Sequence, residues 1–197
     1  NRVMSILRDM APGQEVYSID ESFLDMTGIA DPVALGRMMH ARVLQWTHIP
    51  VCVGIASTKT RAKLANHIAK KSRKCRGVFN LESLTKEQED SLLGKIRVGE
   101  VWGVGRRISD KLSRQGIFTV RDLQRCEPDA IKDHFSVVLA RTVSELQGTS
   151  CLSLEDVAPP KQQIMVSRSF GALVTRYDDL REAVVHYVTR AGEKLRK

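Results

Sequence analysis

Two adjacent carboxylates near the start of the chain are the residues with the clearest chemical potential. Asp20 and Glu21 lie in the segment Ser-Ile-Asp-Glu at residues 18–21, within a stretch of alternating apolar and polar residues over 17–26. Carboxylate oxygens are the ligands that Mg²⁺ prefers, and a pair of such ions can promote phosphoryl transfer. Neighbouring strand residues point to opposite faces, so a shared metal site requires a turn or bulge here and a further carboxylate. Asp-Glu pairs are otherwise common in exposed turns.

A segment rich in lysine and arginine follows the carboxylates along the chain. Residues 57–76 contain eight basic residues and no Asp or Glu, which equals the net charge of +8 of the whole chain. Such a block is typical of a surface that binds polyanions, although a solvated helix face has the same composition. On the helix expected here, Lys59, Lys63 and Lys70 lie on roughly one side. Lys70 stands at the helix end, where it could reach a triphosphate or a nucleic-acid backbone.

A glycine-rich turn provides a third candidate site. Residues 101–108 read Val-Trp-Gly-Val-Gly-Arg-Arg-Ile and lie between two expected helices. This pattern resembles a helix-hairpin-helix element, in which glycines let the backbone approach DNA closely and the N–H groups at a helix N-terminus bind a phosphate. The candidate contacts are Gly103, Val104, Gly105, Arg106 and Arg107. A tight turn between two packed helices is the alternative interpretation.

Elements that would position these residues follow from the spacing of apolar residues in the first part of the chain. The sequence predicts a helix over 1–10, a β-hairpin or two short strands over 17–26, a helix over 31–46, a strand over 50–55, a helix over 58–71 and a strand over 77–79. The predicted buried stripe of the second helix is Val33, Leu35, Met38, Met39, Val43 and Leu44. The order β-β-α-β-α-β is typical of a sheet with helices packed on one face.

The character of the sequence changes after residue 80. The expected elements are helices over 81–146, a proline-containing linker over 148–163, a strand over 164–170 and a further helix from about residue 178. Alternation along the expected strand places Ser169 and Arg168 on opposite faces. An isolated arginine on a strand is usually a surface residue, so this segment alone indicates no function.

Composition excludes several other classes of protein. The chain has 42% hydrophobic and 27% charged residues, as in a globular protein, and no apolar run reaches the ~18–20 residues of a membrane span. The four cysteines are spread without a Cys-x-x-Cys pair, which argues against a disulfide framework or a zinc site. Both ends fall inside expected helices and the first residue is not Met, so we expect an internal piece of a longer protein.

In their order along the chain, four segments resemble the Y-family of translesion DNA polymerases. They are SIDESFLD (18–25), VGIASTKTRAKLANHIAKK (53–71), VWGVGRRISDKL (101–112) and SRSFG (167–171). The likeness covers essentially all 197 residues. It is greatest to the UmuC group of that family, the catalytic subunits of bacterial DNA polymerase V and their plasmid-borne relatives.

This resemblance implies an α+β architecture with four parts. They are the C-terminal part of a polymerase palm with a mixed sheet over 1–80, an all-helical thumb with a helix-hairpin-helix over 81–150, a linker over 151–163, and the start of an α/β little finger over 164–197. It also implies an error-prone polymerase of the bacterial cytoplasm that acts in SOS mutagenesis and DNA repair.

Site residues and partners are likewise implied by the resemblance. Asp20 and Glu21 would hold two catalytic Mg²⁺ ions, Lys70 would contact the triphosphate of the incoming dNTP, Gly103 to Arg107 would touch the primer-side backbone, and Arg168 and Ser169 would touch the template. Asp25 matches a family residue that we interpret as structural. The implied partners are primed or damaged DNA, dNTP, the processed accessory subunit of polymerase V, the RecA filament and the sliding clamp, with no membrane.

The chain also departs from the family pattern. The first metal-binding aspartate, the fingers and the residue that excludes ribonucleotides lie upstream in the family and are not in these 197 residues. We therefore expect this chain alone to bind DNA weakly without polymerising. One alternative is a non-catalytic DNA-binding module built on the hairpin and the basic helix. Another is a palm-fold enzyme such as a nucleotide cyclase, in which the thumb hairpin has no place.

Overall fold

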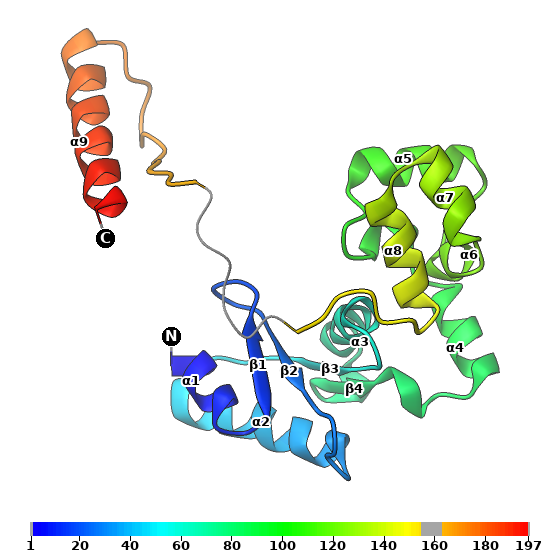
Figure 1. Cartoon of the computed structure of the whole chain (residues 1–197). Coiled ribbons are helices and arrows are strands. Elements are labelled where there is room, and N and C mark those ends of the chain that lie inside the picture. The colour runs from blue at the N-terminus through cyan, green and yellow to red at the C-terminus, as the bar shows by residue number, and fades with distance from the viewer. Residues whose placement is uncertain (1, 155–162, 197) are drawn as a thin grey trace. The chain divides into compact units, whose positions relative to one another are not determined.

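Residues 2–154 and 163–196 are described by the computed structural model (Figure 1). Their contacts divide the chain into two units, Asn1–Val157 and Ala158–Lys197. Helices outnumber short strands, so the mixed α+β class predicted from the sequence is confirmed. Within the part of the chain that the structure describes, no helix combines the length and the apolar character needed to cross a membrane.

The first unit starts with helix α1 (Arg2–Arg8) and an antiparallel hairpin of β1 (Gly13–Val16) and β2 (Ser22–Asp25). Val16 pairs with Ser22 in the register, so the five residues between them form the turn. The predicted hairpin is confirmed, but it begins earlier than the pattern of alternation indicated. The two candidate carboxylates lie in this turn, as a shared site requires.

A second pair of strands is parallel and consists of β3 (Val53–Ile55) and β4 (Val78–Asn80). Helix α3 (Lys59–Lys71) connects them, followed by the 3₁₀ turn η1 (Arg73–Cys75). The predicted strands and helix are confirmed here. Within the described residues no ladder joins β2 to β3, however, so the strands form two separate ribbons rather than the one sheet that their order predicted.

Helix α2 (Pro32–Thr47) begins where the sequence predicts, because the Asp31 carboxylate accepts a hydrogen bond from the Ala34 N–H at 2.9 Å. Its buried stripe is narrower than predicted. Met39 and Val43 are fully buried, whereas Met38 and Leu44 are 53% and 41% exposed. The reason is that α1 and the short strands β3 and β4 cover one side of the helix.

Short helices predominate over residues 81–146, as the sequence predicts. They are η2 (Leu81–Ser83), α4 (Lys86–Leu93), η3 (Val98–Glu100), α5 (Arg106–Arg114), α6 (Val120–Gln124), α7 (Pro128–His134) and α8 (Val137–Leu146). The element before the glycine-rich turn is thus a 3₁₀ turn, η3, and not the full helix that the helix-hairpin-helix pattern predicted.

One hydrophobic core serves α3 and these short helices together. Leu64, Ala65 and Ile68 of α3 are buried in the same cluster as residues of every helix from α4 to α8. In Figure 1, α3 accordingly lies between the strands β3 and β4 and the green-to-yellow helices. The predicted boundary between palm and thumb near residue 80 therefore falls within one continuous core.

Strand β3 and helix α3 approach each other closely at Gly54. A Cβ atom at this position would lie 2.1 Å from the Asn66 nitrogen and 2.3 Å from the Ala62 oxygen. Both atoms belong to the backbone of α3, which cannot rotate away as a side chain can. A glycine is therefore required at this point for the helix to pack on the strand.

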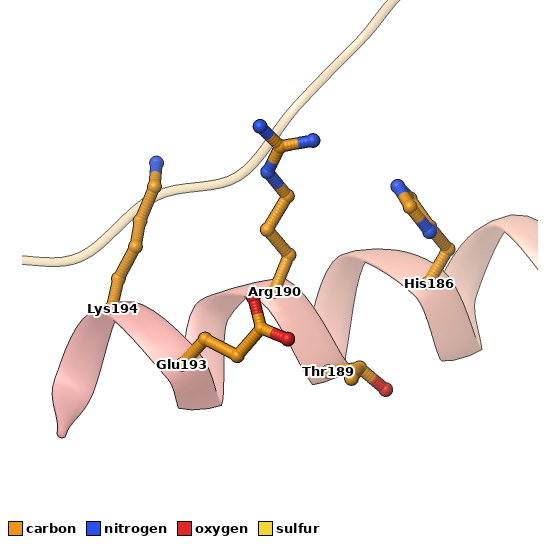
Figure 2. A pocket seen from close by; sticks show the side chains of 5 residues that line it. All are labelled: His186, Thr189, Arg190, Glu193 and Lys194. Carbon is orange, nitrogen blue, oxygen red and sulfur yellow. The ribbon is translucent and has the colours of Figure 1, made fainter.

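The second unit consists of helix α9 (Tyr177–Leu195) and an extended segment before it. The Lys194 ammonium donates a hydrogen bond to the Met165 carbonyl at 3.2 Å. A pocket on α9 is lined by His186, Thr189, Arg190, Glu193 and Lys194 (Figure 2).

The predicted strand over 164–170 is wrong, because none of residues 163–176 forms a strand. Alternation alone does not make a strand, since its backbone groups need a hydrogen-bonded partner. No segment among residues 163–196 supplies one. Most of the predicted linker over 151–163 lies at 155–162, outside the described residues.

Candidate functional site

Asp20 and Glu21 lie together in the exposed turn between β1 and β2. The N–H groups of Tyr17 and Ser18 both donate to the Glu21 carbonyl, at 3.1 and 3.0 Å, which closes the turn. The Ser18 hydroxyl donates to the Asp20 carboxylate at 2.6 Å. The chain thus forms the local turn that two neighbouring carboxylates need in order to serve one site.

Lys63 of α3 pairs with this turn. Its ammonium donates to the two carboxylate oxygens of Glu21 at 3.2 and 3.0 Å. The same ammonium lies 4.7 Å from the ring centroid of Tyr17 and 5.0 Å from that of Trp102. One lysine therefore connects the basic helix, the carboxylate turn and the glycine-rich turn.

An aromatic cluster of Tyr17, Phe23 and Trp102 packs beside the carboxylates. The Trp102 indole N–H donates to the Tyr17 hydroxyl at 3.3 Å, and the two rings meet edge to face with centroids 5.3 Å apart. Phe23 lies 5.8 Å from Trp102. Because Trp102 directly precedes Gly103, the cluster brings the two predicted sites, 85 residues apart in sequence, next to each other.

At the glycine-rich turn an uncapped helix end faces solvent. Gly103 has φ +84, which favours glycine, and Gly105 begins α5 without a side-chain cap. The first N–H groups of a helix have no partner within it, and here Arg106 and Arg107 are exposed beside them. This arrangement suits a phosphate group.

Two other predicted contacts differ in their surroundings. Val104 is only 4% exposed, and its N–H donates to the Val101 carbonyl at 3.0 Å. Its side chain is part of the core, so a contact with DNA at this position would involve the backbone, and it stays a prediction.

Lys70 is exposed near the end of α3. It lies about 10 Å along the helix axis from Lys63, given a rise of about 1.5 Å per residue.

Arg168 and Ser169 are exposed in the extended segment of the second unit. Since the two units are described separately, the structure does not place these residues relative to Asp20 and Glu21. Their role at the template strand remains a prediction.

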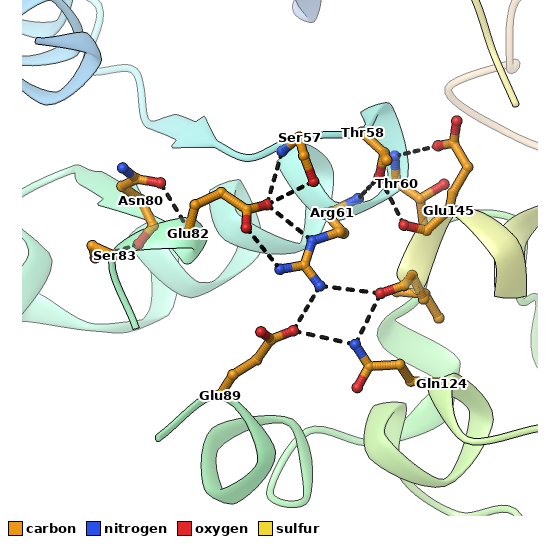
Figure 3. Close-up of polar contacts among 11 residues, drawn as sticks. Ser57, Thr58, Thr60, Arg61, Asn80, Glu82, Ser83, Glu89, Gln124 and Glu145 are labelled. Atoms are coloured by element: carbon orange, nitrogen blue, oxygen red, sulfur yellow. Dashed lines mark hydrogen bonds and ion pairs between the residues drawn. The ribbon is translucent and has the colours of Figure 1, made fainter. Parts of the chain in front are cut away.

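Arg61 is buried, although the basic segment that contains it predicted an open basic surface. It is 5% exposed, and its guanidinium donates to Glu82 at 3.0 Å, to Glu89 at 2.6 Å and to the Leu146 carbonyl at 3.1 Å (Figure 3). Gln124 donates to Glu89 and Leu146 as well. The eight basic residues of the block therefore include one that holds α3 to the helices that follow.

Glu145 is a fully buried acidic residue that the sequence patterns did not single out. Its carboxylate accepts the Thr60 N–H at 2.8 Å, in the first turn of α3 (Figure 3). The other carboxylate oxygen accepts the N–H groups of Cys151 and Leu152 at 3.0 and 3.1 Å. Hydrogen bonds to backbone N–H groups and the positive end of the α3 dipole stabilise this carboxylate.

Acid sensitivity follows from the network around Arg61. Burial alone would raise the pKa of Glu82, but hydrogen bonds from Arg61 and Ser57 outweigh it and hold the pKa below 4.5. The stabilising contribution of Glu82 is therefore fully present above pH 4.5 and is lost as the pH falls through the lower pKa of the folded state. We expect the urea midpoint of the protein to fall more steeply below pH 4.5 than that of Glu82→Gln.

Glu127→Gln is the matched control for this titration, because the Glu127 side chain does not cap α7. Its urea midpoint should follow that of the unsubstituted protein over the same pH range. Identical slopes for the unsubstituted protein and Glu82→Gln would contradict the role of Glu82.

Metal binding by the turn can be judged from its donor set. Asp20 and Glu21 supply exposed carboxylate oxygens, which suit a hard divalent cation. Within residues 2–154 and 163–196, no group of three or more acidic, His or Cys side chains is gathered that could hold a metal ion. The two carboxylates therefore fit part of such a site and need at least one further ligand.

Comparison with known proteins identifies sequence relatives. Residues 1–67 match the impB/mucB/samB family. The whole chain is 52% identical to the protein UmuC of Salmonella typhimurium, and it covers 47% of that protein. It is 47% identical over its whole length to SamB of Salmonella typhimurium, again covering 47% of the relative. The chain thus spans about half the length of the curated relatives it matches.

Solved structures agree with the sequence comparison. The post-insertion binary complex of Dbh DNA polymerase superposes with a TM-score of 0.61 at 28% identity, covering 79% of this chain and 45% of that one. DinB from Sulfolobus solfataricus gives a TM-score of 0.60 at 26% identity, with 79% and 46% covered. The α+β arrangement of this chain is therefore that of Y-family polymerases.

Proposed function

We propose that the protein that carries this chain is a Y-family translesion DNA polymerase, because residues 1–67 match the impB/mucB/samB family, the whole chain is 52% identical to UmuC, and the fold is similar to that of DinB. In this proposal, residues 1–80 form part of the palm, 81–150 the thumb and 164–197 the start of the little finger. The observation that carries it is the junction of the Asp20-Glu21 turn with the glycine-rich turn through Tyr17 and Trp102. Such a junction would place a DNA phosphate held at the glycine-rich turn near the two carboxylates.

The proposed reaction is template-directed nucleotidyl transfer. The primer 3′-oxygen attacks the α-phosphorus of a dNTP, a new P–O bond forms, and the bond to the β-phosphate breaks to release pyrophosphate. Asp20 and Glu21, with a further ligand, would hold divalent cations, for which we propose Mg²⁺. Such ions supply positive charge that activates the attacking oxygen and stabilises the leaving group. Lys70 would neutralise the triphosphate from the end of α3.

Primer extension on a template with one abasic site tests this function. The protein that carries this sequence, supplied with its accessory partners, is expected to insert a nucleotide opposite the lesion and to continue beyond it. Binding to the primed template without any extension would instead support the alternative of a non-catalytic DNA-binding module.

Binding of the DNA backbone is proposed for Gly103, Gly105, Arg106 and Arg107, and the two arginines give a direct test. Each phosphate contact contributes about 0.9 to the slope of log K against log salt concentration for duplex DNA. Arg106→Gln and Arg107→Gln should therefore each reduce that slope by about 0.9, equally for different sequences. Fluorescence anisotropy at several salt concentrations measures the slope.

Arg114→Gln provides the matched control, since Arg114 is exposed in the last turn of α5, at the end opposite the glycine-rich turn. Its slope should stay close to that of the unsubstituted protein. Equal slopes for all three variants would exclude the N-terminus of α5 as the DNA contact.

Partners beyond DNA and dNTP follow from the family. We propose that the protein works in the bacterial cytoplasm with a processed accessory subunit, the RecA filament and the sliding clamp, and that Arg168 and Ser169 contact the template. The identity to UmuC along the whole chain supports these assignments.

A further inference from the structure

Lys63 occupies a cage made of one carboxylate and two aromatic rings. Glu21 accepts hydrogen bonds from its ammonium through both oxygens, and the rings of Tyr17 and Trp102 lie within about 5 Å of the same nitrogen. A cation attracts the electron-rich face of an aromatic ring, most strongly for tryptophan. The ammonium is thus bound as a cationic ligand would be, although it belongs to the protein.

The cage is held in shape by contacts that do not involve Lys63. Trp102 donates its indole N–H to Tyr17, and Phe23 packs against both rings with centroids 5.9 and 5.8 Å away. The Lys63 side chain is 22% exposed, whereas that of Glu21 is 50% exposed. The carboxylate is therefore open to solvent on the side that the lysine does not cover.

A divalent cation at the Asp20-Glu21 turn would compete with this lysine. Since both Glu21 oxygens already bind the ammonium, a second cation on the same carboxylate would lie within a few ångströms of it, and like charges at that distance repel. The long, flexible lysine stem can withdraw, whereas the turn itself keeps its backbone hydrogen bonds to the Glu21 carbonyl and the bond from the Ser18 hydroxyl to Asp20.

We propose that Lys63 is a resident counter-ion of Glu21, which leaves the carboxylate when a divalent cation binds. This proposal rests on the proposed function, because it assumes that the turn holds a metal. Before metal binds, the lysine neutralises the turn and keeps Glu21 at one position. Divalent cations must therefore displace a protein cation first, which lowers their apparent affinity for the turn.

Calorimetric titration with Mg²⁺ of the protein that carries this sequence measures this competition. Lys63→Met is expected to bind Mg²⁺ roughly 3- to 30-fold more tightly than the unsubstituted protein, the factor that corresponds to the loss of one exposed ion pair and one exposed cation–π contact. Lys63→Gln should show the same direction.

Trp102 fluorescence reports the departure of the lysine directly. Trp46 and Trp102 are the two tryptophans of the sequence, and Trp46 is 60% exposed, so Trp46→Phe leaves Trp102 as a single reporter. Its emission should change as Mg²⁺ saturates the turn. The same titration in Trp46→Phe with Lys63→Met should leave the emission nearly constant, because no ammonium lies over the indole.

Lys59→Met is the matched control for charge. Lys59 lies one turn earlier on α3, pairs with Glu15 and contacts the Phe23 ring, so its removal deletes the same charge without freeing Glu21. Its Mg²⁺ affinity should stay well below that of Lys63→Met. Lys71→Met, at an exposed position, replaces this control if Lys59→Met does not fold, as checked by circular dichroism.

The outcomes separate this proposal from the proposed function. If Lys63→Met binds Mg²⁺ no more tightly than the unsubstituted protein, the displacement of Lys63 is overturned. If Mg²⁺ binding is at the same time lost in Glu21→Gln, the turn is still the metal site. If no variant binds Mg²⁺, the metal-binding role of the turn fails, and the displacement of Lys63 fails with it. Lesion bypass by the protein that carries this sequence still tests the polymerase assignment independently.

Discussion

Glu21→Gln and Asp20→Asn are each expected to lower the rate of primer extension by about 100- to 1,000-fold in the protein that carries this sequence. The loss of one carboxylate removes several kcal/mol of electrostatic stabilisation from a metal-assisted phosphoryl transfer, and about 1.4 kcal/mol corresponds to a tenfold change in rate. Both side chains are exposed, so the fold should persist. Single-turnover extension at saturating dNTP measures the rate, and anisotropy shows whether the primed template is still bound.

Asp25→Asn is the matched control for these two substitutions. Asp25 ends β2 in the same hairpin, and its carboxylate accepts the Thr27 N–H at 2.9 Å. It is thus an acidic residue with a local structural contact, and its amide variant should extend primers within a few-fold of the unsubstituted protein. Unchanged rates for Asp20→Asn and Glu21→Gln would favour the alternative of a DNA-binding module without catalysis.

The largest expected effect on stability is that of Gly54→Ala. The new methyl group would overlap the Asn66 nitrogen and the Ala62 oxygen of α3, at 2.1 and 2.3 Å. Overpacking typically costs about 1–3 kcal/mol, and a clash with helix backbone belongs at the upper end or above it. We expect a loss of about 3 kcal/mol or more, which corresponds to a fall in Tm of about 6–12 °C for a chain of this size.

Gly105→Ala tests whether any added methyl group has this effect. Gly105 has φ −76, and a Cβ there meets no atom within 4 Å. Its cost should stay below about 1 kcal/mol, the usual size of an N-cap effect. Thermal unfolding followed by circular dichroism compares the two variants, and similar melting temperatures would show that α3 does not pack against Gly54 as closely as described.

Local signals in the sequence predicted most of the elements. The cap at Asp31 acts over a few residues, so α2 begins where the sequence indicated, and the helix predicted over 58–71 is found as α3. The carboxylate turn was also predictable, because two adjacent acidic residues cannot share a site on a straight strand.

Contacts between distant segments were not predictable in this way. Trp102 was part of a recognised motif, but its contact with Tyr17 spans 85 residues and leaves no periodic pattern. Arg61 was counted with a basic surface because its charge is visible in the sequence, whereas its acidic partners come from η2 and α4. A buried Glu145 is likewise indistinguishable from an exposed helical glutamate until α8 is placed against α3.

The hydrogen bond between Thr60 and Glu145 has a consequence for synthesis on the ribosome. The two residues are 85 positions apart, and at about 5–20 residues per second that separation corresponds to roughly 4–17 s of translation. During this interval the start of α3 lacks its buried acceptor and Arg61 lacks the Leu146 carbonyl. The contacts of α3 therefore cannot be completed until α8 has been synthesised. Rare codons between these positions would prolong the exposure of the incomplete chain to proteases and chaperones.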